Sequence, residues 1–343
     1  MAQLEVTVIG RVDGISAAGD TGKQGFRHQW PAVYANARFS GDAIFLAFDD
    51  AINRYRVTLD AADESVLVIT RPGKNAVQIT GLGPGPHHVR LDKISESLSG
   101  TGDFVGFFVP VGGKALAPPD RKMRQIEVIG DSDAVGYGNA SSSRDCAEDE
   151  VFFLTDTQDA FGPRVARSFD ADYQIIAVSG IGLVRNYGGS HPETTMLTLY
   201  TRLLIDQPIP SRPDGWNPQV VVFELGSNDF ATQVEPGEDW SGQEALRIDF
   251  ETRYISFVEM VRGRYPRAQF ILVAMDDYGQ DYLEAHRKVL TGLQSGGDEN
   301  VAMAVFPKME KIGCHWHPSD RDHQMLADGI ISFIDGQPGV WNN

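Results

Sequence analysis

The strongest constraint on the fold is a change in the pattern of apolar residues near residue 125. From there to the carboxyl end, short apolar runs alternate with longer amphipathic segments. Short apolar runs indicate buried strands, and the segments between them have the length and pattern of helices. This alternation predicts an α/β domain: a parallel sheet with helices on both faces, joined by right-handed crossovers. The expected strands are 126–129, 174–178, 220–225, 270–275 and 301–306, and the expected helices lie near 158–169, 193–206, 243–264, 281–294 and 319–334.

The residues before this point follow another pattern. Apolar segments of strand length are separated by breaks that carry Gly, Pro or Asp, such as 71–73 and 81–86. Breaks of this composition favour turns, so residues 1–110 predict an all-β sandwich or jelly roll. Residues 111–124 shift in composition and are expected to be a linker, which leaves residues 125–343 as the α/β domain. The expected β segments are 4–9, 43–48, 55–59, 65–69, 88–91 and 104–109.

Composition excludes several classes of partner. The 343 residues carry a formal net charge of −17, whereas nucleic-acid phosphates are bound by clustered Lys and Arg. No apolar run approaches the roughly 20 residues of a membrane span, so neither nucleic acid nor membrane is expected as a partner. Residues 1–6 lack the basic and apolar regions of a signal peptide. A cytoplasmic protein and a lost leader both remain open, as does the oligomeric state.

Four segments with unusual residues stand at the ends of the expected elements. Gly-Asp-Ser at 130–132, Ser-Gly-Ile-Gly at 179–182 and Gly-Ser-Asn-Asp at 226–229 each follow an expected strand. Gly-Cys-His-Trp-His-Pro at 313–318 comes just before the last helix. Because the carboxyl ends of parallel strands share one edge of a sheet, we expect these segments to meet there.

The residue types in these segments match one kind of chemistry. Ester hydrolysis through an acyl-enzyme needs a nucleophile, a base, donors for the oxyanion and a group that orients the base. Ser132 can supply the nucleophile, and a histidine of the last loop can supply the base. The backbone amides of Ser132 and Gly180 and the side-chain amide of Asn228 can surround an oxyanion. This route needs no cofactor, and the alternative for Ser132 is a helix N-cap.

The four segments resemble the sequence blocks of the SGNH (GDSL-like) hydrolases over residues 125 to 335. The resemblance implies Ser132 as nucleophile, Gly180 and Asn228 as oxyanion donors and His317 as base. It also implies an SGNH-type parallel sheet flanked by helices.

A narrower resemblance covers nearly the whole chain. Segments 10–13, 30–31, 37–41 and 104–107 resemble the β-sandwich that precedes the SGNH domain in carbohydrate esterase family 2, and 136–139 and 313–318 resemble its hydrolase domain. Members of that family remove O-acetyl groups from polysaccharides such as xylan and glucomannan. The resemblance therefore implies a secreted or periplasmic serine esterase acting on acetylated carbohydrate.

The sequence departs from these families beside the base. SGNH hydrolases usually place Asp three residues before the histidine, and family 2 members often place it two before, but here Cys314 and His315 stand at those positions. Either a backbone carbonyl orients His317, or an acid comes from elsewhere. Asp320 and Asp322 are near in sequence but are expected to begin the last helix.

Several alternatives stay open. His315, His317, Asp320, Asp322 and His323 have side chains that can bind zinc or manganese, although a metal site would leave the serine and oxyanion features without a purpose. The missing acid also allows a carbohydrate-binding protein with an impaired site, or a short-chain esterase of other substrates. Residues that either pack or form a sugar platform are Trp316, Tyr137, Tyr187 and Phe230. The two cysteines, Cys146 and Cys314, are either separate thiols or one disulfide near the site.

Overall fold

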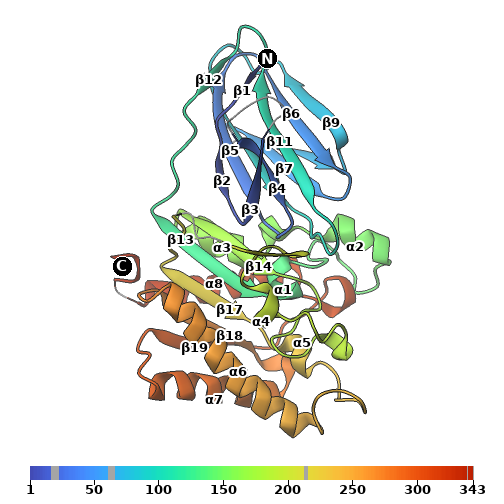
Figure 1. Ribbon diagram of the computed structural model, residues 1–343, viewed down its shortest axis with the longest axis vertical. Coiled ribbons are helices and arrows are strands. Elements are labelled where there is room, and N and C mark those ends of the chain that lie inside the picture. Colours follow the sequence, from blue (N-terminus) through green and yellow to red (C-terminus); the bar gives the residue numbers. More distant parts are fainter. Residues whose placement is uncertain (17–22, 61–65, 212–214, 338, 343) are drawn as a thin grey trace. The chain divides into compact units, whose positions relative to one another are not determined.

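A computed structural model describes residues 1–16, 23–60, 66–211, 215–337 and 339–342. The chain divides into two compact units (Figure 1). Unit 1 comprises residues 1–122 and 203–211, and unit 2 comprises residues 123–202 and 212–343.

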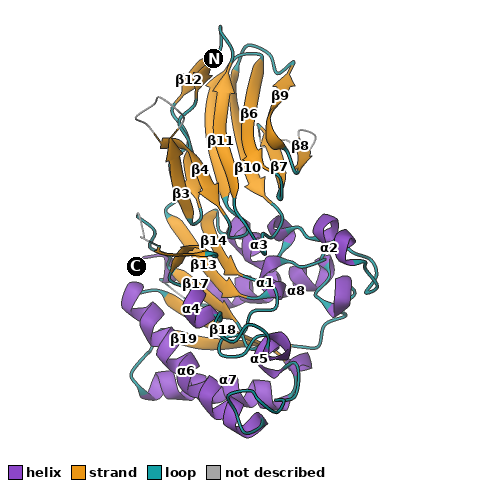
Figure 2. Cartoon of the chain, turned by 45° about the vertical axis from the view of Figure 1, so that its right-hand side comes forward, coloured by secondary structure: helices purple, strands orange, loops and turns teal. Residues whose placement is uncertain are grey.

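Unit 1 is a β-sandwich (Figure 2). Its strands are β1 (Ala2–Gln3), β2 (Thr7–Ile9), β3 (Val12–Ser16), β4 (Lys23–His28), β5 (Tyr34–Ser40), β6 (Ala43–Asp50), β7 (Arg54–Leu59), β8 (Val66–Thr70), β9 (Gly73–Thr80), β10 (Pro86–Lys93), β11 (Gly102–Val109) and β12 (Lys114–Leu116). One antiparallel sheet has the order β3-β4-β11-β6-β9, with β1 beside β11, and the other has the order β12-β5-β10-β7-β8, with β2 beside β5. Alternate apolar side chains fill the core, as in β7, where Tyr55, Val57 and Leu59 are buried.

Part of this β-structure differs from the expected segments. Strands β3 and β4 are absent from the expected set because they contain no continuous apolar run. Strand β12 lies within the expected linker and pairs with β5. The expected segment 65–69 begins at Ser65, which lies outside the described residues.

Unit 2 contains a parallel sheet of the order β14-β13-β17-β18-β19. The strands are β13 (Arg124–Gly130), β14 (Ala171–Ala177), β17 (Val220–Glu224), β18 (Gln269–Met275) and β19 (Val301–Phe306). Gly130, the last residue of β13, is in register with Ala177 of β14 and Glu224 of β17. The segments that follow these three strands therefore leave the sheet at one edge.

Helices cover both faces of this sheet, which confirms the predicted fold class (Figure 1). Helix α3 packs with α8, while α6 packs with α7 on the opposite face. None of the described helices is both long and apolar enough to cross a membrane. The α-helices are α1 (Ser132–Val135), α2 (Glu148–Leu154), α3 (Phe161–Ser168), α4 (Met196–Leu199), α5 (Ser227–Phe230), α6 (Gln243–Arg264), α7 (Gln280–Ser295) and α8 (Asp320–Asp335), and the 3-10 helices are η2 (Thr157–Asp159), η3 (Tyr187–Gly189), η4 (Asp276–Tyr278), η5 (Cys314–Trp316) and η6 (Val340–Asn342).

The predicted helix at 193–206 is wrong. Only α4 forms there, and the chain continues into a hairpin of β15 (Arg202–Leu204) and β16 (Gln207–Pro210). Residues 202–204 form backbone hydrogen bonds with a second strand instead of continuing the helix. Residues 203–211 instead join unit 1, where the indole of Trp30 donates to the carbonyl of Leu203 over 3.1 Å.

Candidate active site

The turn between β13 and α1 carries Ser132. Asp131 is the N-cap of α1, since its carboxylate accepts the amide of Asp133 over 3.0 Å. Ser132 is therefore the first residue of the helix and not its cap, and its hydroxyl makes only a long contact of 3.5 Å with Oδ1 of Asp131, which leaves room for a closer partner.

That partner is His317. The Oγ of Ser132 lies 2.9 Å from Nε2 of His317, although the two residues are 185 positions apart. The other ring nitrogen, Nδ1, lies 2.9 Å from the carbonyl oxygen of Cys314. A carbonyl can only accept, so Nδ1 carries the hydrogen and Nε2 accepts the serine proton. A backbone carbonyl thus contacts the imidazole where SGNH hydrolases usually place a carboxylate.

Electrostatics keep this imidazole in its basic form. Burial lowers the pKa of His317, while the carboxylate of Asp133 and the carbonyl of Cys314 act in the opposite direction. Lys311 and His315 also lower this pKa. A lowered pKa leaves the ring neutral at neutral pH and able to take a proton.

The backbone amides of Ser132 and Gly180 follow the ends of the neighbouring strands β13 and β14. Among the described groups, none accepts from the amide of Ser132 or of Gly180. Gly180 has φ 78°, a left-handed conformation that favours glycine, and a Cβ added there would meet nothing within 4 Å. A side chain at this position would therefore enter open space.

The side chain of Asn228 is placed differently. Its Nδ2 donates to the carbonyl of Ile181 over 2.8 Å and to Oδ2 of Asp131 over 3.1 Å. Both of its hydrogens are thus engaged before any oxyanion is present. The structure brings Asn228 to the expected edge of the sheet.

The loop that carries Gly180 is held by Asp229. Its buried carboxylate accepts the amides of Leu183, Val184 and Arg185 over 2.8 to 2.9 Å. Burial raises the pKa of Asp229 to about 6 even though these hydrogen bonds lower it. This role was missed in the sequence, but the position of Asp229 directly after Asn228 was the available signal.

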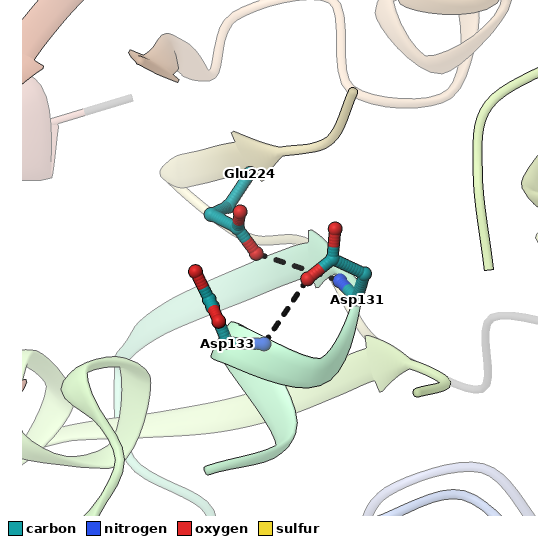
Figure 3. A group of neighbouring side chains, drawn as sticks. All are labelled: Asp131, Asp133 and Glu224. Carbon is teal, nitrogen blue, oxygen red and sulfur yellow. Dashed lines mark hydrogen bonds between the residues drawn. The ribbon is translucent and has the colours of Figure 1, made fainter. Parts of the chain in front are cut away.

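Three buried carboxyl groups lie close together, two from the residues on either side of Ser132 in the chain and one from the end of β17 (Figure 3). One oxygen from each of Asp131, Asp133 and Glu224 lies within 4.8 Å of the others. Burial, with the carboxylate of Asp133, raises the pKa of Asp131 to about 7. Burial, with the carboxylates of Asp131 and then Asp133, raises the pKa of Glu224 well above its ordinary value. Ser227 and Asn228 both donate to Oδ2 of Asp131. The raised pKa values favour the protonated forms of Asp131 and Glu224, and the donors at Oδ2 of Asp131 offset the burial of its carboxylate.

The histidines and acids near the carboxyl end have other partners. Asp322 completes a capping box in the first turn of α8, since its carboxylate accepts the amide and hydroxyl of the N-cap Ser319, and it also accepts the amides of Glu310 and Lys311. Asp320 pairs with Arg164. Among the described residues, the three carboxyl groups of Figure 3 lie close enough together to share a metal ion, whereas the C-terminal histidines and acids form no such group.

The two cysteines, whose pairing the sequence did not decide, are bonded to each other. Cys146, in the loop after α1, forms a disulfide with Cys314 across 168 positions. The carbonyl that contacts His317 therefore belongs to a residue of this disulfide.

The four aromatic residues differ in their surroundings. Trp316 is 65% exposed, with the guanidinium of Arg144 at 3.7 Å from its ring centre. Tyr187 is 59% exposed, and its amide donates to the carbonyl of Gly180. Phe230 instead packs against the rings of Phe250 and Tyr282. Tyr137 packs on His317 itself, with ring centres 4.3 Å apart.

The fold and the Ser132–His317 pair define an SGNH-type ester hydrolase. Residues 8–119 match the family described as carbohydrate esterase 2 N-terminal. The chain is 43% identical over 316 residues, covering 92% of this chain and 87% of the relative, to an acetylxylan esterase / glucomannan deacetylase of Cellvibrio japonicus. The chain belongs to carbohydrate esterase family 2, and it is a carboxylic ester hydrolase.

Solved structures agree with this assignment. The chain is similar to the carbohydrate esterase of a study entitled "The active site of a carbohydrate esterase displays divergent catalytic and non-catalytic binding functions", with TM-score 0.91, 41% identity and coverage of 99% of this chain and 100% of the other. It is also similar to a family two carbohydrate esterase from Clostridium thermocellum in complex with cellohexaose, with TM-score 0.84, 27% identity and coverage of 98% and 99%.

Proposed function

We propose that the protein is a serine esterase that removes O-acetyl groups from carbohydrate through an acetyl-enzyme. The observation that carries this proposal is the 2.9 Å contact between Oγ of Ser132 and Nε2 of His317. His317 takes the serine proton while the oxygen attacks the acetyl carbonyl. The protonated imidazole then gives this proton to the leaving sugar oxygen.

Water completes the reaction. It attacks the acetyl-enzyme with His317 again as base, which releases acetate and restores the serine hydroxyl. In both steps the amides of Ser132 and Gly180 donate to the oxyanion. Asn228 joins them by exchanging its bond to Asp131, which at 3.1 Å is the longer of its two hydrogen bonds.

Carbohydrate is the proposed acyl carrier for two reasons. The relative from Cellvibrio japonicus is an acetylxylan esterase / glucomannan deacetylase, and the Clostridium thermocellum structure is a complex with cellohexaose. In this chain, the exposed rings of Trp316 and Tyr187 offer apolar faces on which a sugar ring can stack. Phe230 is left out because its ring packs inside unit 2.

The test compares Ser132→Ala with wild type on p-nitrophenyl acetate and on acetylated xylan. Loss of the nucleophile is expected to lower kcat by at least about a thousandfold. Ser256→Ala is the matched control, because Ser256 lies on the exposed surface of α6 and donates only to the carbonyl of Thr252. Equal rates for wild type and Ser132→Ala would refute the mechanism.

The same experiment decides between hydrolysis and binding alone. The lack of a carboxylate in contact with either ring nitrogen of His317 favours an impaired site as the second candidate. That candidate predicts retention of both proteins on a glucomannan or xylan gel, with no acetate released by wild type. Acetate release from p-nitrophenyl acetate but not from polysaccharide would identify a short-chain esterase of other substrates.

A further inference from the structure

The orientation of the base depends on a single peptide unit. The carbonyl oxygen of Cys314 accepts both the backbone amide of His317, over 3.1 Å, and its Nδ1, over 2.9 Å. No side-chain carboxylate contacts either ring nitrogen of His317 in the described chain. Any shift of the Cys314 carbonyl is therefore passed directly to the imidazole that must face Ser132.

The backbone between Cys314 and His317 adopts a conformation that is unfavourable for residues with side chains. His315 has φ 53° and Trp316 has φ 66°, so two consecutive residues with side chains adopt the left-handed conformation. Such a conformation costs on the order of 1–3 kcal/mol for each residue and persists only where surrounding contacts impose it. The base loop, defined as residues 310–318, thus needs an external restraint.

The facing loop, defined as residues 136–147, supplies that restraint. The amide of His315 donates to the carbonyl of Arg144 over 2.8 Å, and Nε2 of His315 lies 2.9 Å from the carbonyl of Cys146. Nε2 must donate in that contact, so Nδ1 accepts the hydroxyl of Tyr137 over 3.0 Å. Ordinary hydrogen bonds therefore fix His315 on both of its ring nitrogens.

A covalent bond restrains Cys314 itself, the residue whose carbonyl contacts His317. Cys314 is fully buried, and its disulfide joins it to the partly exposed Cys146. Its amide also donates to the carbonyl of Gly138 over 3.2 Å. The residue that orients the base is thus anchored at its side chain and at its amide, both to the facing loop.

We propose that Cys146 is a positioning residue for the reaction, because its disulfide to Cys314 fixes the carbonyl that orients His317 in place of a triad carboxylate. This inference rests on the proposed function of Ser132 and His317. The arrangement works only where a disulfide persists, which is in oxidising surroundings.

The test uses the full chain with p-nitrophenyl acetate, before and after reduction with tris(2-carboxyethyl)phosphine. The phosphine becomes its oxide as the disulfide becomes two thiols, and mass measurement after alkylation confirms both thiols. We expect kcat to fall about tenfold or more with KM changed less than twofold, and re-oxidation to restore it. The acid limb of kcat/KM should also move to lower pH, since the Cys314 carbonyl raises the pKa of His317.

Variants separate positioning from stability. Cys146→Ser and the double variant Cys146→Ser/Cys314→Ser should show the same loss of kcat and no response to reductant, with near-ultraviolet circular dichroism confirming a folded protein. Full kcat in reduced wild type would overturn the proposal, as would a loss that only follows unfolding. If oxidised wild type cleaves no ester, the proposed function fails instead, and the two failures are distinct.

Discussion

Gly138 provides a sharp test of the close approach between the base loop and the facing loop. It has φ 57°, and a Cβ added there would lie 2.8 Å from Sγ of Cys314, 3.1 Å from its amide nitrogen and still nearer to its Cβ. Contacts below 3.0 Å force a neighbour to move. In this case the neighbour is a buried disulfide and the backbone that carries it, neither of which can yield cheaply.

Two costs add in Gly138→Ala. An alanine in the left-handed conformation costs about 1–2 kcal/mol. Overlap in a packed region costs about 1–3 kcal/mol more. Gly297→Ala is the matched control in the same unit, because Gly297 also has a positive φ, 94°, but a Cβ there would meet nothing within 4 Å. The control should therefore show the first cost alone.

The assay is urea unfolding together with kcat on p-nitrophenyl acetate. Gly138→Ala should be less stable than Gly297→Ala by about 1–3 kcal/mol. Its kcat should fall on the order of tenfold or more, because small displacements of a catalytic group are costly. Gly297→Ala should keep wild-type kcat. Equal stabilities for the two variants, with full kcat for Gly138→Ala, would refute the reasoning.

Two further predictions concern charge and substrate contact. Asp133 favours the protonated form of His317, so Asp133→Asn should lower the pKa of His317 further and move the acid limb of kcat/KM to lower pH; an unmoved limb in a pH series would contradict this. Trp316→Ala should raise KM for acetylated xylan roughly two- to tenfold, because an aromatic contact contributes about 0.5–1.5 kcal/mol to binding. Trp316→Phe should retain most of that contact, and p-nitrophenyl acetate should respond little, whereas equal effects on both substrates would argue against a sugar platform.

The sequence anticipated the parts of the fold that depend on local pattern. Periodicity placed the five strands of the parallel sheet and most of its helices, because a strand buried on both faces is a short continuous apolar run. The segment 193–206 was misjudged as a helix because its polar and apolar spacing suits a helix, whereas pairing with a second strand decided its end. Strands β3 and β4 carried no such signal.

By itself, the sequence determined which residue types stand at which strand ends. A hydroxyl at 132, a glycine at 180, an amide side chain at 228 and a histidine at 317 can be read from the chain, and parallel strands bring three of these segments to one edge. Only the tertiary structure decided which group contacts Nδ1 of His317, the ring nitrogen that does not face Ser132. Every residue has a carbonyl, so no residue type marks the one that accepts from Nδ1, and the disulfide that holds it depends on two loops meeting in space.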